Sequence, residues 1–257
     1  KETIAVRVER PNFPADAGAV ILLKNVTSFK ELDQAKTNFI ATISHELKTP
    51  ISSIKMSLSL LEDKRIGPLN EDKQKLLAHI RGDSKRLLNI TGELLDLAQV
   101  ETGNIRLNIL PGDPNNILQY ALETVQIQAE QKNVRLEIHK DDDLPMIKTD
   151  TDKTTWVLVN LLTNAIHYSP EGSAVVIELR KEPGALVFSV RDFGKGIEER
   201  FHSRLFDRYF QVPDSPQTGT GLGLAICKEF IEAQGGEIGL ESEVGKGSRF
   251  YFRVFGV

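Results

Sequence analysis

Two long stretches of this chain carry apolar residues at steps of three and four. This spacing places the side chains on one stripe of an α-helix and is typical of helices that pack side by side. Gly67-Pro68 separates the two stretches, so they should form an antiparallel helical hairpin. One hairpin has too little surface to bury both stripes, which favours a dimeric four-helix bundle. The stripe residues are Leu32, Ala35, Phe39, Ile43, Leu47, Ile51, Ile54, Leu58 and Leu61 in the first stretch, and Leu77, Ile80, Ser84, Leu87, Thr91, Leu94 and Ala98 in the second.

A histidine lies on the far side of the first helix from its apolar stripe. At about 100° per residue, His45 lies roughly 160–200° from Ile43 and Leu47, so its imidazole should be exposed. A neutral imidazole nitrogen can attack phosphorus. Glu46 is the candidate base that stabilises the ring, and Thr49, one turn on, could hold a water in line with a phosphohistidine. This stretch therefore predicts a phosphoryl relay.

The pattern changes after Gly103-Asn104, where short β-like runs begin to alternate with helical runs. Mixed strands with helices to one side predict a two-layer α/β sandwich, so the whole chain belongs to the α+β class. We expect helices at 114–132, 151–167 and 221–234, and strands at 105–110, 134–139, 174–180, 186–191, 237–241 and 249–255.

Two further β-like runs, 4–8 and 19–26, precede the helices and predict a hairpin-like pair of strands. Three parts follow from these patterns. They are a strand-rich segment at 1–27, a helical dimerisation and phosphotransfer domain at 28–104, and an α/β domain at 105–257.

Three polar segments of the α/β domain suit a ligand that bears phosphate. Asn160 and Asn164 share one face of a helix, where amides can bind a hard cation or phosphate oxygens. Asp192 follows a strand and can accept a hydrogen bond from an exocyclic amine, and the glycines after it let the backbone approach a planar ring. Residues 218–223, Thr-Gly-Thr-Gly-Leu-Gly, open a helix whose first N–H groups favour phosphate. Each segment alone is weak evidence.

In this order, the segments resemble those of sensor histidine kinases of two-component systems. Residues 44–50, Ser-His-Glu-Leu-Lys-Thr-Pro, resemble the HisKA-type phosphoacceptor motif. Residues 160–170 resemble the N box, 192–197 and 218–223 the two glycine boxes, and 205–211 the F box. These boxes resemble those of the Bergerat-type ATPase domain that histidine kinases share with DNA gyrase and MutL. Residues 19–32 also look like the last strand of a PAS sensory domain running into a signalling helix.

The resemblance implies that the α/β domain binds ATP and Mg²⁺. Asn164 would hold the metal, Asp192 would read adenine, and Ser248 would be a water-linked second acceptor. His167 and Gln211 stand where the family often has a basic residue, so phosphate contacts there would be weaker or, at His167, dependent on pH. The implied nucleotide-binding residues are Asn160, Asn164, His167, Tyr168, Asp192, Gly194, Gly196, Ile197, Phe206, Arg208, Gly219, Thr220, Gly221, Leu222, Gly223 and Ser248.

The implied activity is ATP-dependent autophosphorylation of His45, followed by transfer of the phosphoryl group to an aspartate on a cognate response regulator. The protein would also remove the phosphoryl group from that regulator. Two alternatives remain open. A gyrase-like ATPase clamp would have no use for the His45 face. A nucleotide-sensing module that acts mainly as a phosphatase through Glu46 and Thr49 is kept open by the departures at His167 and Gln211.

Composition narrows the expected partners and location. The formal charge of −4 over 257 residues contains no charge block, so nucleic acid is not an expected partner. The single cysteine, Cys227, excludes an intrachain disulfide and fits a reducing compartment. No apolar run approaches the roughly 20 residues of a membrane-spanning helix. We expect a cytoplasmic homodimer, with a membrane-attached sensory segment upstream of residue 1 left open.

Overall fold

The computed structural model describes residues 4–9, 20–25, 27–63, 67, 69–101, 107–213 and 220–256. The side chains of residues 4–9, 20–25, 27–41, 44, 45, 89 and 94–101 lie outside this description. The chain forms two compact units, Lys1–Asn104 and Ile105–Val257. No helix in the described part of the chain is both long enough and apolar enough to span a membrane.

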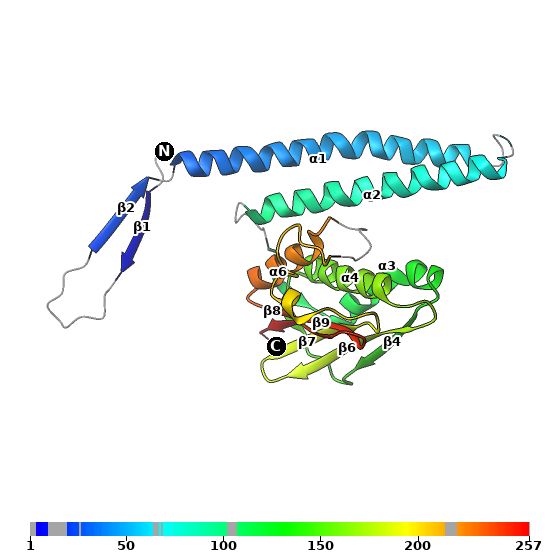
Figure 1. Ribbon diagram of the computed structural model, residues 1–257. Helices are drawn as coiled ribbons and strands as arrows, with labels where there is room; N and C mark the ends of the chain where they lie inside the picture. Colours follow the sequence, from blue (N-terminus) through cyan, green and yellow to red (C-terminus); the bar gives the residue numbers. More distant parts are fainter. Residues whose placement is uncertain are drawn as a thin grey trace. The chain divides into compact units, whose positions relative to one another are not determined.

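The first unit holds a pair of strands and two long helices (Figure 1). Strands β1 (Ile4–Glu9) and β2 (Val20–Asn25) pair antiparallel, as the two β-like runs predict. Helix α1 (Thr27–Leu61) runs on through Pro50, and α2 (Glu71–Glu101) begins after Asn70, whose side chain caps it by accepting the N–H of Lys73 at 2.9 Å. The helical hairpin is therefore confirmed, whereas the PAS resemblance stays a prediction.

The apolar stripes of α1 and α2 are only partly buried within the hairpin. Ile51, Leu58 and Leu77 are buried, together with the small polar residues Ser84 and Thr91. The other described stripe residues are exposed, with exposed fractions of 39–48%. One hairpin thus buries only part of its stripe and leaves the remainder available for packing against another surface. The exposed stripe residues are Ile43, Leu47, Ile54, Leu61, Ile80 and Leu87.

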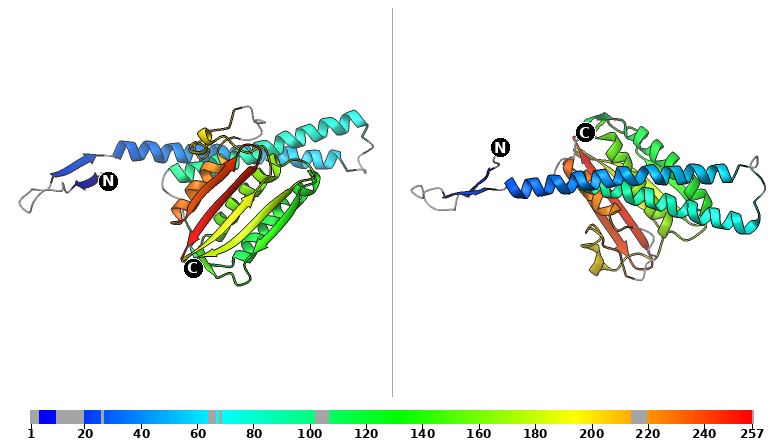
Figure 2. Two further views of the ribbon diagram at one scale, coloured as in Figure 1. Left: turned by 60° about the horizontal axis from the view of Figure 1, so that its bottom comes forward. Right: turned by 90° about the horizontal axis from the view of Figure 1, so that it is seen from above.

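The second unit is built on a mixed five-stranded sheet in the order β4-β6-β7-β9-β8 (Figure 2). Only the β4–β6 pair is parallel among these described strands. A small antiparallel pair, β3 with β5, lies in the same unit. The bounds are β3 Leu110–Gly112, β4 Arg135–Lys140, β5 Ile147–Thr149, β6 Ala174–Glu182, β7 Ala185–Arg191, β8 Glu237–Glu243 and β9 Gly247–Phe255.

Three helices cover one face of this sheet and form the core with it (Figures 1 and 2). Asp113 caps α3 and Asp150 caps α4, each accepting a backbone N–H of the first turn. In the sheet, Phe188 and Phe252 stack at 4.8 Å between ring centroids, and on the helices Trp156 meets Phe230 edge-on at 5.4 Å. The helices are α3 (Pro114–Gln131), α4 (Thr151–Tyr168) and α6 (Gly223–Ala233), and a short α5 (Glu199–His202) precedes α6. The two-layer α/β fold is confirmed.

Several expected element bounds were wrong. Of the strand expected at 105–110, residues 107–109 are not strand: the N–H of Asn108 donates to the Asp150 carboxylate at 2.9 Å, and the strand begins at Leu110 (Leu110–Gly112). Residues 105 and 106 lie outside the described residues. Strand β5 and helix α5 were not expected, since each is too short to show a period. Helix α6 begins at Gly223, two residues after the expected start.

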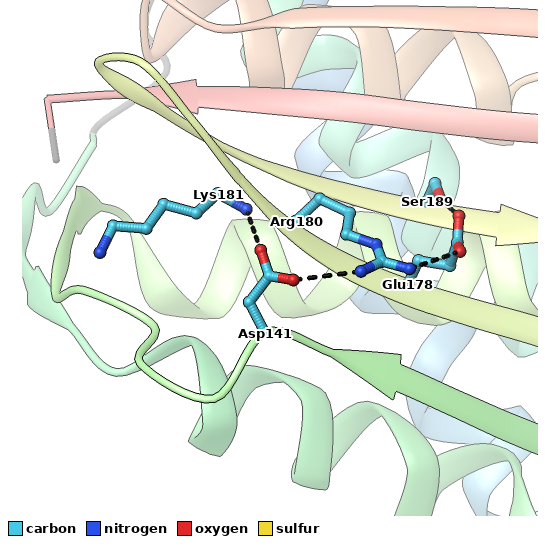
Figure 3. Close-up of polar contacts among 5 residues, drawn as sticks. All are labelled: Asp141, Glu178, Arg180, Lys181 and Ser189. Atoms are coloured by element: carbon cyan, nitrogen blue, oxygen red, sulfur yellow. Dashed lines mark hydrogen bonds and ion pairs between the residues drawn. The ribbon is translucent and has the colours of Figure 1, made fainter.

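Charged side chains of β6 form a polar cluster with Asp141, which follows β4 (Figure 3). Asp141 accepts hydrogen bonds from the backbone N–H of Lys181 at 2.8 Å and from Arg180 at 3.1 Å. These bonds, led by that of Lys181, lower the pKa of Asp141. Arg180 also contacts Glu178, which accepts a hydrogen bond from Ser189. None of these residues belongs to the segments that the sequence predicts to bind a nucleotide.

Candidate functional site

A buried carboxylate, Asp192, lies directly after β7 at the strand's end. Strand β9 begins beside it, and the N–H of Asp192 donates to the carbonyl of Ser248 at 2.8 Å. One carboxylate oxygen, Oδ1, accepts from the N–H of Gly194 at 2.8 Å and of Ser248 at 3.3 Å. Burial raises the pKa of Asp192, and these N–H donors oppose the rise. Oδ1 is thus fixed by the backbone, and Oδ2 is the oxygen that can meet a ligand.

The glycine loop after Asp192 packs closely on its neighbours. A Cβ at Gly194 would lie 2.5 Å from the carbonyl oxygen of Tyr168, at the end of α4. Gly196 has φ +69° and abuts the backbone of Glu243, so a side chain is excluded there on both counts. Glycine is therefore needed to bring this loop against α4 on one side and the β8–β9 turn on the other.

Ser242 ties the end of the glycine loop to Ser248. Its hydroxyl oxygen accepts the N–H of Ile197 at 2.9 Å and donates to the carbonyl of Gly247 at 3.0 Å. It also lies 3.0 Å from the hydroxyl of Ser248. Ser248 is buried; its backbone N–H donates to Asp192, and its hydroxyl contacts that of Ser242. Ser248, the expected second acceptor, therefore lies beside the Asp192 carboxylate.

Asn160 and Asn164 share one face of α4, as their spacing predicts. The side-chain amide of Asn164 donates to Oδ1 of Asn160 at 3.2 Å. A Cβ at Gly223, the first residue of α6, would lie 2.7 Å from the side-chain nitrogen of Asn160. The amide pair therefore lies against the start of α6, where the N–H groups of the first turn have no helical partner.

His167 and Tyr168 occupy the last turn of α4. Their rings meet edge-on, 4.9 Å apart at 84°. His167 is half-buried, and burial followed by the charge of Lys132 lowers its pKa, so the imidazole is neutral at neutral pH. Tyr168 is exposed, and its carbonyl contacts the glycine loop.

The segment between the two glycine boxes is anchored to α6. Tyr209 has φ +63°, and its N–H donates to the carbonyl of Gly221 at 2.9 Å. Arg208 forms an ion pair with Glu229 of α6 at 3.3 Å, and Phe206 is half-buried. Gln211 is also half-buried.

The second glycine box is described only from Thr220 onward. The hydroxyl oxygen of Thr220 accepts the N–H of Leu222 at 3.1 Å, just before Gly223 begins α6. Leu222 is buried and Gly221 packs against the backbone of Tyr209. Gly219, an expected binding residue, lies outside the described residues.

The expected relay residues lie on the middle of α1. Glu46 and Thr49 are exposed there. His45 lies in the same helix, but its side chain is outside the described part, so its predicted exposure stays a prediction.

Two family models match the chain in the order of its two units. Residues 35–103 match the His Kinase A (phospho-acceptor) domain, and residues 149–255 match the histidine kinase-, DNA gyrase B- and HSP90-like ATPase. Between them they place a phospho-acceptor helix and an ATPase domain in one chain. The chain belongs to the sensor histidine kinases.

Curated sensor kinases resemble nearly all of this histidine kinase chain. The alginate biosynthesis sensor protein KinB of Pseudomonas aeruginosa is 31% identical over 91% of the chain and 39% of its own length. The sensor histidine kinase WalK of Bacillus subtilis is 32% identical over 92% of the chain and likewise 39% of its own length. The chain therefore spans about two fifths of these relatives.

Solved histidine kinase structures share the fold. Full-length ShkA, crystallised in complex with AMPPNP, matches with a TM-score of 0.70 and 28% identity over 84% of this chain and 45% of ShkA. The histidine kinase AdeS of Acinetobacter baumannii matches with a TM-score of 0.57 and 25% identity over 82% of this chain and 97% of the AdeS chain.

Two contacts of this histidine kinase were missed from its sequence. Lys132, at the end of α3, donates to the carbonyls of Ile166 and His167 at the end of α4. Gln234, at the end of α6, accepts the N–H of Asp150 at the start of α4 at 2.7 Å. The partners are far apart in the chain, and no local period or motif signals such pairs.

Proposed function

We propose that this chain is an ATP-dependent autokinase that phosphorylates His45 and passes the phosphoryl group to an aspartate of a response regulator. The observation that supports it most is the buried Asp192, whose Oδ1 is held by two backbone N–H groups at the first glycine box. This arrangement leaves a carboxylate oxygen to accept the exocyclic amine of adenine. In a family with a phospho-acceptor helix, a site of this kind supplies ATP to that helix.

The length of α4 suits a nucleotide laid along it. Tyr168 contacts the glycine loop near Asp192, while Asn160 contacts the start of α6, eight residues earlier or about 12 Å along the helix axis. That span is comparable to an extended nucleoside triphosphate. Adenine would lie at Asp192, with Ser248 behind it, and the phosphates at the start of α6. The lining residues would be Asn160, Asn164, His167, Tyr168, Gly194, Gly196, Ile197, Phe206, Arg208, Gly219, Thr220, Gly221, Leu222 and Gly223.

Magnesium would be held mainly by the nucleotide. No group of three or more His, Cys, Asp or Glu that could hold a metal ion occurs in the part of the chain that the structure describes. Mg²⁺ commonly binds through one or two protein oxygens, substrate phosphates and water, which fits a single amide oxygen. Because the nitrogen of Asn164 donates to Asn160, its Oδ1 is the atom suited to the ion. The ion would neutralise charge on the phosphates.

The chemistry at α1 requires a nucleophile and a base. A ring nitrogen of His45 would attack the γ-phosphorus of ATP, the bond to the bridging oxygen would break, and ADP would leave. The carboxylate of Glu46 would stabilise the positive charge that develops on the ring and take its proton. Transfer to a response-regulator aspartate would then return the imidazole to its starting state.

Two further roles follow for the hairpin. The exposed half of the apolar stripe, which includes Leu47, Ile54, Ile80 and Leu87, would be buried by a second copy of the chain in a four-helix bundle. Thr49, exposed one turn from His45, would position the water that removes phosphate from the regulator. The kinase would thus also act as a phosphatase.

Incubation with ATP labelled at the γ-phosphate tests the proposal against its alternatives. An autokinase gives a labelled protein that is labile in acid and stable in alkali, and His45→Ala abolishes the label while ATP still binds. A gyrase-like clamp would hydrolyse ATP without labelling the protein. A phosphatase-dominant module would bind ATP, remain almost unlabelled, and still dephosphorylate the regulator.

A further inference from the structure

Hydrogen bonds at the C-terminal end of α3 hold the backbone of Lys132 in place. Lys132 is the C-cap of the helix, and Asn133 after it has φ +54°. The N–H of Val134 donates to the carbonyl of Ala129 at 2.9 Å, and that of Asn133 to Glu130 at 3.0 Å. These two bonds form the Schellman turn, a common and well-ordered helix end. The root of the Lys132 side chain is therefore held firmly.

The ammonium group of Lys132 reaches the end of α4. It donates to the carbonyl oxygen of Ile166 at 2.9 Å and also to that of His167. These carbonyls belong to the last turn of α4, where backbone oxygens lack helical partners and a cation is favoured. A third bond, from the N–H of Gly172 to the carbonyl of Asn133 at 2.9 Å, joins the same two segments.

The turn that Lys132 holds is the one that meets the glycine loop. The carbonyl oxygen of Tyr168 lies so close to Gly194 that no Cβ would fit between them. The N–H of Gly194 in turn donates to Oδ1 of Asp192 at 2.8 Å. A continuous line of contacts thus runs from Lys132 through the end of α4 to the carboxylate of the candidate site.

We propose that Lys132 is a positioning residue for the nucleotide site, which holds the last turn of α4 against the first glycine loop and so places His167, Tyr168 and Asp192 relative to one another. The inference rests on the proposed nucleotide site. Lys132 acts through backbone carbonyls, so its removal changes where other groups lie without removing a nucleotide contact.

The charge of Lys132 also gives the proposal a spectroscopic signature. After burial, this charge is the second cause that lowers the pKa of His167. Replacing Lys132 with a neutral residue should raise the pKa of His167, whereas Lys132→Arg should keep it low. A change in general stability alone would not move the titration of one ring in this direction.

The test compares Lys132→Met with Lys132→Arg and with Lys148→Met, a matched control because Lys148 is exposed on β5. Calorimetry measures the affinity for AMPPNP, and thermal melting measures folding. NMR follows the titration of His167, whose signal is assigned by its absence in His167→Gln. Lys132→Met should bind AMPPNP about tenfold more weakly, because the last turn of α4 and the first glycine loop are then no longer held in place, and its His167 should titrate at a higher pH. Lys132→Arg and Lys148→Met should stay within about twofold of the unchanged protein.

Each other outcome overturns the proposal. A folded Lys132→Met that binds AMPPNP as tightly as the unchanged chain shows that the contact does not position the site. If that variant does not fold, Lys132→Gln takes its place and the same criterion applies. Failure of both neutral variants to fold would make Lys132 a requirement of the fold. Should the unchanged chain itself fail to bind AMPPNP, the proposed function fails first, and the two failures remain distinguishable.

Discussion

Replacing Asp192 with asparagine should separate nucleotide affinity from folding stability. In the structure, Oδ1 of Asp192 accepts the N–H groups of Gly194 and Ser248, and an amide oxygen can accept both in the same way. The backbone therefore directs the amide nitrogen to the place of Oδ2, where it would oppose a donating adenine amine. Losing a hydrogen bond to a charged group costs about 1.5–3 kcal/mol, which corresponds to roughly 10- to 100-fold weaker binding.

The same substitution should not destabilise the nucleotide-free protein. Burial raises the pKa of Asp192, so the charged carboxylate is a cost to the folded state at neutral pH. That cost is absent below the ordinary pKa of 3.8 and is fully present once the pH exceeds the raised value in the folded protein. Asp192→Asn should therefore melt at an equal or higher temperature than the unchanged protein at pH 7, and the difference should shrink toward pH 4.

Calorimetry with AMPPNP and thermal melts measure both effects, with Asp142→Asn as an exposed control. The control should change neither quantity. Unchanged affinity in Asp192→Asn would refute the adenine role. A large fall in melting temperature together with lost affinity would show instead that the carboxylate supports the fold.

Three further substitutions have expected outcomes. His167→Lys should strengthen AMPPNP binding about tenfold at pH 8, because a fixed charge replaces a ring that is neutral there. Because the pKa of His167 is lowered, its ring becomes charged only below pH 6.5, and the unchanged protein should bind AMPPNP more tightly only there. Calorimetry from pH 8 to 5.5 should show no such rise in affinity for His167→Lys. Leu87→Glu places a charge on the exposed stripe. Light scattering should show monomers of this variant and dimers of the unchanged chain, and a dimeric variant would contradict the proposed four-helix bundle. Thr49→Ala should abolish dephosphorylation of the regulator while largely sparing autophosphorylation, and equal loss of both would end the phosphatase role.

Long periodic elements of this chain were predictable from the sequence because their burial repeats along the helix. The apolar stripe of α1 and the presence of a second helix after Gly67-Pro68 both follow from the spacing and from the break between the two stretches. The two-layer α/β unit also followed, since strand-like and helical runs alternate through it. The sequence could not predict which stripe residues are buried within the hairpin, because all of them follow the same period.

Short elements and long-range contacts were not predictable for physical reasons. Ile147–Thr149 forms a strand only because Leu110–Gly112 pairs with it, and three residues carry no period. The N box and glycine boxes were found as motifs, but the packing of Gly223 on Asn160 and of Gly194 on Tyr168 depends on how distant segments meet. The same holds for the ammonium group of Lys132 at the end of α4.

Locating the phosphoryl group on the chain shows whether the protein is an autokinase that uses His45. The protein is incubated with ATP and Mg²⁺, kept at alkaline pH, digested, and its peptides are sequenced by mass spectrometry. We expect one added phosphoryl group on His45, and none on the same peptide from Asn164→Asp protein incubated alone. Phosphate found on another residue, or on no residue while ATP is hydrolysed, would contradict it.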